Sequence, residues 1–177
     1  RLADPTNLLS MTRMTDTVTD NGAVSTLVYD GIARVMTVTT AAGRSSTLHV
    51  DAQGRVVQGQ MAGLAPTSLA YDSRGLLSTI TAGSGATSRA TSLVHNGAYN
   101  LTGISDPFSR TMNIAYDLAG RPITETLPDG RVIGYAYDAN GNLSGLTPPG
   151  RPRHSFGYTA IDQLAHYTPP DVNPGSD

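Results

Sequence analysis

The residues with the clearest chemical potential in this sequence are tyrosine–aspartate pairs that recur along the chain. The best examples are Tyr71-Asp72, Tyr116-Asp117 and Tyr137-Asp138. A tyrosine ring can stack on a sugar, so Tyr116 and Tyr137 are candidate carbohydrate-binding residues, and each aspartate could act as a general acid or base. A structural role competes with both. Tyrosines of adjacent strands can stack on one another, and an aspartate in a turn can accept backbone N–H bonds. We favour the structural role.

Familiar catalytic and ligand-binding motifs are missing from the sequence. It contains no Gly-x-Ser-x-Gly elbow, no His-Glu-x-x-His pair, no phosphate loop and no dinucleotide fingerprint. The calcium-binding Gly-Gly-x-Gly-x-Asp repeat is missing too. His49 and His95 are interpreted as residues that replace the repeat tyrosine rather than as metal ligands. The sequence predicts a protein that is not an enzyme, with no catalytic residue, no metal and no cofactor.

The tyrosine–aspartate pairs mark a repeat of about 21 residues. If the aspartate or its substitute is the marker, successive markers are 21 residues apart, except for one step of 24 residues. A glycine that permits the positive φ of a tight turn follows three residues later in four copies. The markers are Asp30, Asp51, Asp72, Asn96, Asp117, Asp138 and Thr159, with a weaker first copy at Ala3-Asp4. The other motif residues are Tyr29, Gly54, Tyr71, Gly75, Tyr116, Gly120, Tyr137, Gly141 and Tyr158.

Each repeat has the pattern of a β-hairpin. Residues 122–127 and 132–137 alternate in polarity and flank Pro128-Asp129-Gly130, a strong hairpin signal. No window shows helical periodicity, so we expect an all-β chain with almost no helix. A lone hairpin is marginally stable, so the repeats should pair side by side in one strip, whose free edges favour edge-to-edge self-association. Arginines recur beside the turns, and we expect them to pair with aspartates of neighbouring repeats: Arg34, Arg55, Arg74, Arg121 and Arg131.

Composition narrows the range of partners. The 177 residues carry a formal net charge of −2, which gives no electrostatic reason to expect nucleic acid as a partner. No apolar run approaches the roughly 18 residues of a membrane span, so we expect no membrane insertion. All 12 basic residues are arginine. Lysine, the residue that most often protects exposed strand edges, is therefore absent, and neighbouring strands should cover the edges here.

The repeated pattern Tyr-Asp-x-x-Gly followed by Arg or Asn resembles the YD repeats of RHS (rearrangement hot spot) proteins. These proteins include RHS polymorphic toxins, the C components of bacterial toxin complexes and the teneurins. The resemblance extends from Ala3 to Tyr167 and is strongest in the segments that begin at Tyr71, Tyr116 and Tyr137. It implies a spiralling antiparallel β-sheet strip that forms part of a hollow shell. Family shells also carry an aspartate-dependent self-cleavage site. Asp106-Pro107-Phe108 is the nearest sequence, but it lies in mid-array, so we do not assign this activity.

The resemblance implies a domain organisation and two competing functions. We expect a weak first repeat and irregular entry over residues 1–28, a repeat array over residues 29–167, and a Pro-rich tail over residues 168–177 that leads into further repeats of a longer chain. The first function is a non-catalytic wall segment that encapsulates a C-terminal toxin in a secreted or cell-surface bacterial protein. Its partners would be flanking repeats and the toxin domain. The alternative is an adhesion module that recognises carbohydrate or another protein.

Overall fold

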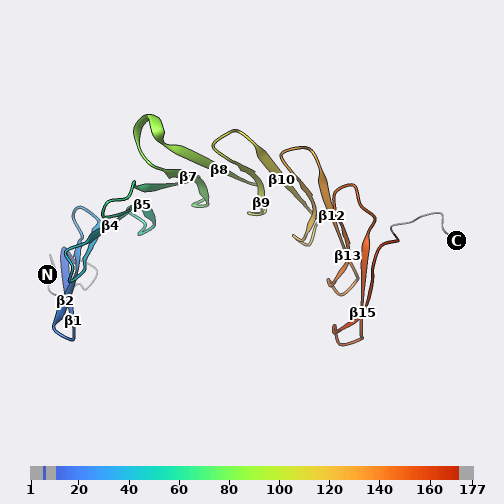
Figure 1. Cartoon of the computed structure of the whole chain (residues 1–177), viewed down its shortest axis with the longest axis horizontal. Helices are drawn as coiled ribbons and strands as arrows, with labels where there is room; N and C mark the ends of the chain where they lie inside the picture. Colours follow the sequence, from blue (N-terminus) through green and yellow to red (C-terminus); the bar gives the residue numbers. More distant parts are fainter. Residues whose placement is uncertain (1–5, 7–10, 172–177) are drawn as a thin grey trace. The chain divides into compact units, whose positions relative to one another are not determined.

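The computed structural model describes residue 6 and residues 11–171 of the chain. Contacts divide the chain into two compact units, residues 1–91 and residues 92–177. In both units the strands are antiparallel and pair in chain order, as a run of successive hairpins (Figure 1). The weak first copy at Ala3-Asp4 and the end of the tail, residues 172–177, lie outside the described residues.

The first unit contains seven complete strands and one turn of 3₁₀ helix. They are β1 (Arg13–Asp20), β2 (Ala23–Asp30), β3 (Val35–Thr39), β4 (Ser45–Val50), β5 (Val56–Met61), β6 (Thr67–Tyr71), β7 (Leu77–Ala82) and the helix η1 (Gly85–Thr87). Strand β8 (Arg89–His95) contains the boundary between the units, and its C-terminal half pairs with β9 in the second unit.

The second unit continues with strands only among the described residues. They are β9 (Leu101–Ser105), β10 (Thr111–Tyr116), β11 (Pro122–Thr126), β12 (Val132–Tyr137), β13 (Leu143–Thr147), β14 (His154–Tyr158) and β15 (Leu164–Thr168). The predicted hairpin around Asp129-Gly130 is formed by β11 and β12, in which Thr124 pairs with Gly134. The predicted all-β fold of antiparallel hairpin repeats is confirmed.

Six strands that lead into a marker turn end in a β-bulge at the tyrosine position, whereas β2 pairs with β3 in unbroken register through Tyr29 and Asp30. The register shifts between Ala70 and Tyr71 in the first unit, and between Ala136 and Tyr137 in the second. A bulge adds a residue to one strand and redirects the side chain beside it. The same shift occurs before Val50, His95, Tyr116 and Tyr158. The tyrosine therefore leaves the regular alternation of its strand, which allows it to contact the preceding repeat.

The bulges also correct one detail of the sequence interpretation. The shift in β4 lies between His49 and Val50, and Val50 pairs with Val56 across the turn. Tyr71 pairs with Leu77 in the same way. Val50, and not His49, therefore occupies the tyrosine position of its repeat. The assignment of His95 is consistent with its pairing to Leu101.

The strip has two chemically different faces in each unit, because neighbours across an antiparallel ladder point to the same side. In the first unit, Tyr29 pairs with Met36 and Met36 with Leu48 on one face. The opposite face is polar: Thr37 pairs with Thr47, which pairs with Gln60.

The second unit repeats this division. Ile104 pairs with Met112, and Tyr135 with Leu146, on the apolar face. The opposite face carries small and polar residues, among them Gly103, Asn113, Thr124, Gly134, Thr147 and Ser155.

The apolar face does not form a closed core. None of the described hydrophobic side chains is fully buried, and Met61 remains 62% exposed. A single layer of sheet has no second layer to cover it, whereas ordinary domains pack two layers around one core. Stability must therefore come from strand pairing, from contacts within the turns and from contacts between successive repeats. Those contacts define the site described next.

Candidate functional site

The aspartate turns are five-residue loops in which the backbone groups find partners. In the turn at Asp117, the Asp117 N–H donates to the carbonyl of Arg121 at 2.9 Å, and the Gly120 N–H donates to the carbonyl of Asp117 at 3.0 Å. The Asp117 carboxylate oxygen Oδ1 accepts the N–H groups of Ala119 and Arg121, at 2.9 and 3.0 Å. Since unpaired backbone groups are costly, the carboxylate acts as the fixed acceptor that completes the loop.

The same carboxylate arrangement recurs in both units. Asp51 Oδ1 accepts the N–H groups of Gln53 and Arg55, each at 2.9 Å. Asp72 and Asp138 accept the equivalent pairs, and Asn96 does so through its amide oxygen. Asp30 differs, because it accepts from Ile32 and Ala33 in a turn of four residues between the paired Asp30 and Val35. The expected Asx-type role of the aspartates therefore agrees with the geometry.

Positive φ angles occur where the sequence places the turn glycines. Gly120 has φ of 78° and Gly141 has φ of 93°, a region that side chains with a Cβ adopt at a cost. Tyr99 and Asp162 adopt φ of 67° and 59° at the equivalent position. In the four-residue turn after Asp30 the positive angle falls on Arg34 rather than on Ala33, at 56°. The turn geometry is thus retained where glycine is replaced.

Four of the five arginines named from the sequence pair within their own turn, so the expected pairing between neighbouring repeats is wrong for them. No ion pair of Arg34 with an aspartate of a neighbouring repeat is found among the described residues. The Arg55 guanidinium contacts the Asp51 carboxylate at 2.7 Å, and Arg121 contacts Asp117 at 2.7 Å. Arg74 and Arg131 likewise bind Asp72 and Asp129 in the same turn. The reason is that the closed loop brings a side chain two or four residues after the aspartate within reach of its carboxylate.

Two of these arginines also contact the next repeat through its tyrosine ring. The guanidinium of Arg55 lies over the ring of Tyr71, at 4.4 Å from the ring centroid, and Arg121 lies over Tyr137 at 4.5 Å. Guanidinium groups stack favourably on aromatic faces. The aspartate holds the arginine on one side and the tyrosine covers its other side. We call this three-residue unit, Asp51–Arg55–Tyr71 or Asp117–Arg121–Tyr137, the inter-repeat clamp.

The tyrosine hydroxyls complete the connection between repeats. Tyr71 donates to the carbonyl of Val56 at 2.8 Å, and Tyr137 donates to that of Pro122 at 2.9 Å. Tyr116 and Tyr158 make the equivalent bond fifteen residues back, to Leu101 and Leu143 at 2.7 and 3.1 Å. The expected stacking of repeat tyrosines on one another is replaced by these hydrogen bonds. Aromatic stacking among the described residues instead involves Phe156 and Tyr167, with centroids 5.4 Å apart.

This geometry also bears on the two candidate carbohydrate-stacking residues. Arg121 already lies over the ring of Tyr137, and the hydroxyl of Tyr137 is bonded to a backbone carbonyl. The hydroxyl of Tyr116 is bonded as well. Both tyrosines are partly buried contacts between repeats rather than open aromatic platforms.

Electrostatics favours the ionised form of the turn aspartates. The pKa of Asp117 is lowered, first because the Arg121 N–H donates to the carboxylate and then because the guanidinium does. The pKa of Asp72 is lowered chiefly by the Leu76 N–H. A carboxylate with a depressed pKa is a poor general base near neutral pH. Among the described residues, no group of three or more His, Asp or Glu side chains is placed to hold a metal ion.

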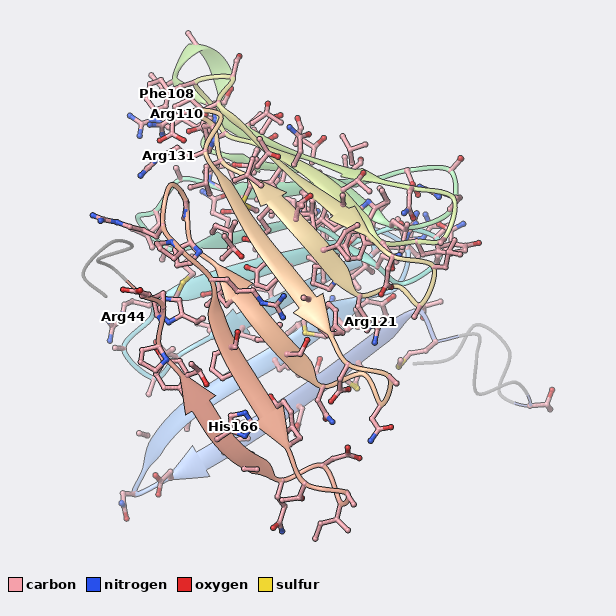
Figure 2. The ribbon with its side chains drawn as sticks, turned by 90° about the vertical axis from the view of Figure 1, so that its right-hand side faces the viewer. Arg44, Phe108, Arg110, Arg121, Arg131 and His166 are labelled. Carbon is pink, nitrogen blue, oxygen red and sulfur yellow. The ribbon has the colours of Figure 1, made fainter. Side chains whose placement is uncertain are left out.

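One member of the motif was missed at the opposite rim of the second unit. Asp106 accepts the N–H groups of Phe108 and Arg110 at 2.9 and 3.0 Å, and it forms an ion pair with Arg110. Ser109 takes the positive φ of 60°. In Figure 2, Phe108, Arg110 and Arg131 lie together at this rim, away from Arg121. The Asp-x-x-x-Arg spacing, shared with Asp51 and Asp117, was the available signal.

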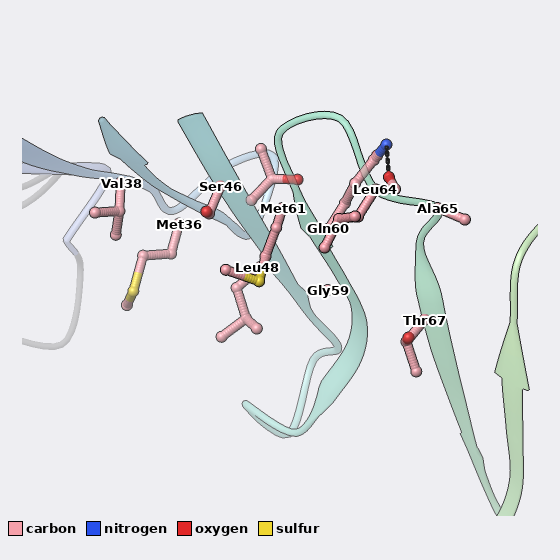
Figure 3. Close-up of a pocket in the computed structure, with 11 residues that line it drawn as sticks. Met36, Val38, Ser46, Leu48, Gly59, Gln60, Met61, Leu64, Ala65 and Thr67 are labelled. Carbon is pink, nitrogen blue, oxygen red and sulfur yellow. Dashed lines mark hydrogen bonds between the residues drawn. The ribbon is translucent and has the colours of Figure 1, made fainter. Parts of the chain in front are cut away.

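The first unit also contains an open groove on its apolar face, with a volume of about 490 Å³ (Figure 3). Strands β3 to β5 supply its floor, and the loop after β5 supplies its rim. Gln60 donates to the carbonyl of Leu64 at 3.2 Å and fixes that loop. The apolar side chains that line it are Met36, Val38, Leu48, Met61, Leu64 and Ala65. In the part of the chain that the structure describes, no helix has the length and apolar character needed to cross a membrane.

These features define a class of protein: a single-layer array of antiparallel hairpins, in which the same contacts join successive repeats. Residues 116–153 match the family model of the RHS repeat. The resemblance to YD (RHS) repeats is thereby confirmed, and the chain contains RHS repeats in the segment where the motif is best preserved. Comparison with the curated proteins gives no match.

Solved structures of Tc toxins share the fold. The Tc holotoxin pore of Photorhabdus luminescens matches with a TM-score of 0.66 and 17% identity over 82% of this chain. The crystal structure of TcdB2-TccC3-Cdc42 matches with a TM-score of 0.61 and 16% identity over 80%. TcdB2-TccC3 without its hypervariable C-terminal region matches with a TM-score of 0.59 and 17% identity over 80%. This chain covers only 8 to 9% of the length of those chains.

Proposed function

We propose that this chain is a non-catalytic wall segment of an RHS shell, and that the longer protein containing it encloses a C-terminal toxin or effector. The observation that carries the proposal is the RHS-repeat match at residues 116–153, on a fold like that of the Tc toxins. One of the matched proteins, TcdB2-TccC3, has a hypervariable C-terminal region, which is the kind of segment that a shell would enclose. Flanking repeats and that C-terminal domain would be the partners.

The turn chemistry supports a structural role. The carboxylates are used as acceptors for backbone N–H groups, and the tyrosine hydroxyls as donors to backbone carbonyls. Groups engaged in this way hold successive repeats in register. The residues we assign to this role are the motif residues named above, with Asp106 and Arg110 added. A secreted or cell-surface bacterial location follows from the proposal, as for toxins of this kind.

Binding of a glycan or protein by the same strip is the weaker alternative. Both tyrosines proposed for sugar stacking are engaged in contacts between repeats. A glycan array with the 177-residue chain tests this alternative. Saturable binding that Tyr116→Ala and Tyr137→Ala abolish, in variants that remain folded, would support adhesion and count against a purely structural role.

The experiment for the main proposal uses the complete protein that contains this array. Limited proteolysis should leave its C-terminal region intact while the shell is folded. Replacing Gly120 and Gly141 together by valine places a branched side chain at positive φ in two successive turns, and should expose that region to cleavage. Valine at Gly97, which has no positive φ and open space around it, is the matched control. Equal cleavage of the C-terminal region in the wild type and the double variant would contradict the proposal.

A further inference from the structure

Among the described residues, the apolar face of the second unit carries one carboxylate. Glu125 in β11 is the only glutamate in the chain. It pairs with Ile114 of β10 on one side and with Ile133 of β12 on the other. Because directly paired residues share a face, Glu125 stands between two isoleucines in the middle of this surface. Tyr135 lies on the same face two residues after Ile133, and pairs with Leu146.

The surroundings of Glu125 do not neutralise its charge. The pKa of Tyr135 is raised, first by burial and then by hydrogen bonding to and the charge of Glu125. Glu125 belongs to no ion pair among the described residues, whereas five turn aspartates pair with arginines. The arginines of the unit lie in the turns and outside the strands. The Glu125 side chain is partly exposed, so water can hydrate the charge of its carboxylate.

A layer that covered this apolar surface would remove that water. A buried carboxylate without a cationic partner is strongly unfavourable, whereas burial of the surrounding isoleucines is favourable. The chemistry of the surface therefore selects its partner: apolar side chains for the isoleucines and a cation for Glu125.

We propose that this face docks an apolar polypeptide segment that places one lysine or arginine side chain over Glu125. The source of the segment rests on the proposed function, since an enclosed C-terminal domain is the polypeptide that such a wall would meet. A second copy of this chain fits less well. Two such faces packed together would bury Glu125 without an arginine or lysine, because the strands of the unit carry neither after β8. The histidine on this face, His154, pairs with Leu146 and is already hydrogen-bonded to the Tyr167 hydroxyl.

The test measures binding of synthetic peptides to the 177-residue chain. The first probe is an alternating peptide, Thr-Leu-Thr-Val-Thr-Lys-Thr-Val-Thr-Leu-Thr, which presents apolar side chains and the lysine on one side of a strand. The second probe has glutamine in place of the lysine. We expect the lysine peptide to bind roughly tenfold more tightly, which is the effect of one charged hydrogen bond.

Two variants assign this preference to Glu125. Glu125→Gln should abolish the difference between the two peptides. Asp129→Asn removes the same charge from the adjacent turn, outside the apolar face, and should leave the preference intact. In Glu125→Arg, a peptide with a central glutamate should bind better than the lysine peptide. Circular dichroism of each variant establishes that it is folded.

Several results would overturn the proposal: equal binding of the two peptides, no binding of either, or a lysine preference that survives in Glu125→Gln. Dimerisation of the chain through this face in place of peptide binding would overturn it too. Failure of the proposed function is recognised separately, because the proteolysis experiment measures protection of the C-terminal region and not charge preference. Peptide binding without such protection would leave the docking face in place and contradict encapsulation.

Discussion

Substitution of Tyr137 tests the inter-repeat clamp most sharply. Tyr137→Phe keeps the ring beneath Arg121 and removes the hydroxyl that donates to the Pro122 carbonyl at 2.9 Å. Loss of a partly buried hydrogen bond is expected to lower the free energy of unfolding by about 1 kcal/mol. Tyr137→Leu removes the ring as well. It should cost roughly 0.5 to 1 kcal/mol more, the usual value of a partly exposed guanidinium–aromatic contact.

A double-mutant cycle isolates the contact between the repeats. The four proteins are the wild type, Tyr137→Leu, Arg121→Gln and the double variant, unfolded in urea and followed by circular dichroism. The coupling energy should be about 0.5 to 1 kcal/mol in favour of the native pair. Leu118→Ala is the control, because this fully exposed turn residue should change stability by less than about 0.5 kcal/mol.

Local hydrogen exchange gives a second measure, because repeat arrays can unfold unit by unit. Amides of β11 and β12 should lose more protection in Tyr137→Phe than those of the first unit. A stability unchanged by Tyr137→Phe, together with a coupling energy near zero, would refute the inter-repeat clamp.

Three further predictions concern the turns. Gly141→Ala should lower the free energy of unfolding by about 1 to 2 kcal/mol in urea denaturation, because alanine is strained at φ of 93°, whereas Gly97→Ala should change it little. Asp117→Asn should lower the melting temperature less than Asp117→Ala, because Asn96 already accepts the equivalent two N–H bonds through its amide oxygen. An equal loss of melting temperature in both variants would contradict this role of the carboxylate. The pKa of Asp117 is lowered in the folded chain, so its ionisation stabilises the fold above the ordinary pKa of 3.8, and this stability is lost as pH falls through the lowered folded value. Acid titration should therefore show a loss of stability that starts below about pH 4. Unchanged stability down to about pH 2 would contradict this prediction.

Much of the fold could be predicted because the repeat is local. A Gly or its substitute three residues after the marker fixes the turn in every copy but that of Asp30, and alternating residues on both sides fix the strands. The hairpin at Asp129-Gly130 was predicted from two residues and their flanks, and it is present. Chain-order pairing follows from the same regularity, since each hairpin can bury its strand edges only against its neighbours.

The contacts of the side chains could not be predicted from spacing alone. The tyrosine bond to a carbonyl fifteen residues back depends on the bulge at each tyrosine, and bulges have no marker in this sequence. The direction of Arg121 depends on the closed loop that brings it to Asp117 and leaves its flat side open to Tyr137. The place of Glu125 on the apolar face could be found only from the pairing register.

The most direct test of the central claim is proteolytic protection of the C-terminal region in the complete protein, measured with and without an intact array. If these repeats are part of an enclosing wall, the C-terminal region stays protected in the wild type and in the Gly97→Val control, and becomes cleavable in the Gly120→Val, Gly141→Val double variant. Cleavage of the C-terminal region at the same rate in all three proteins would contradict the claim.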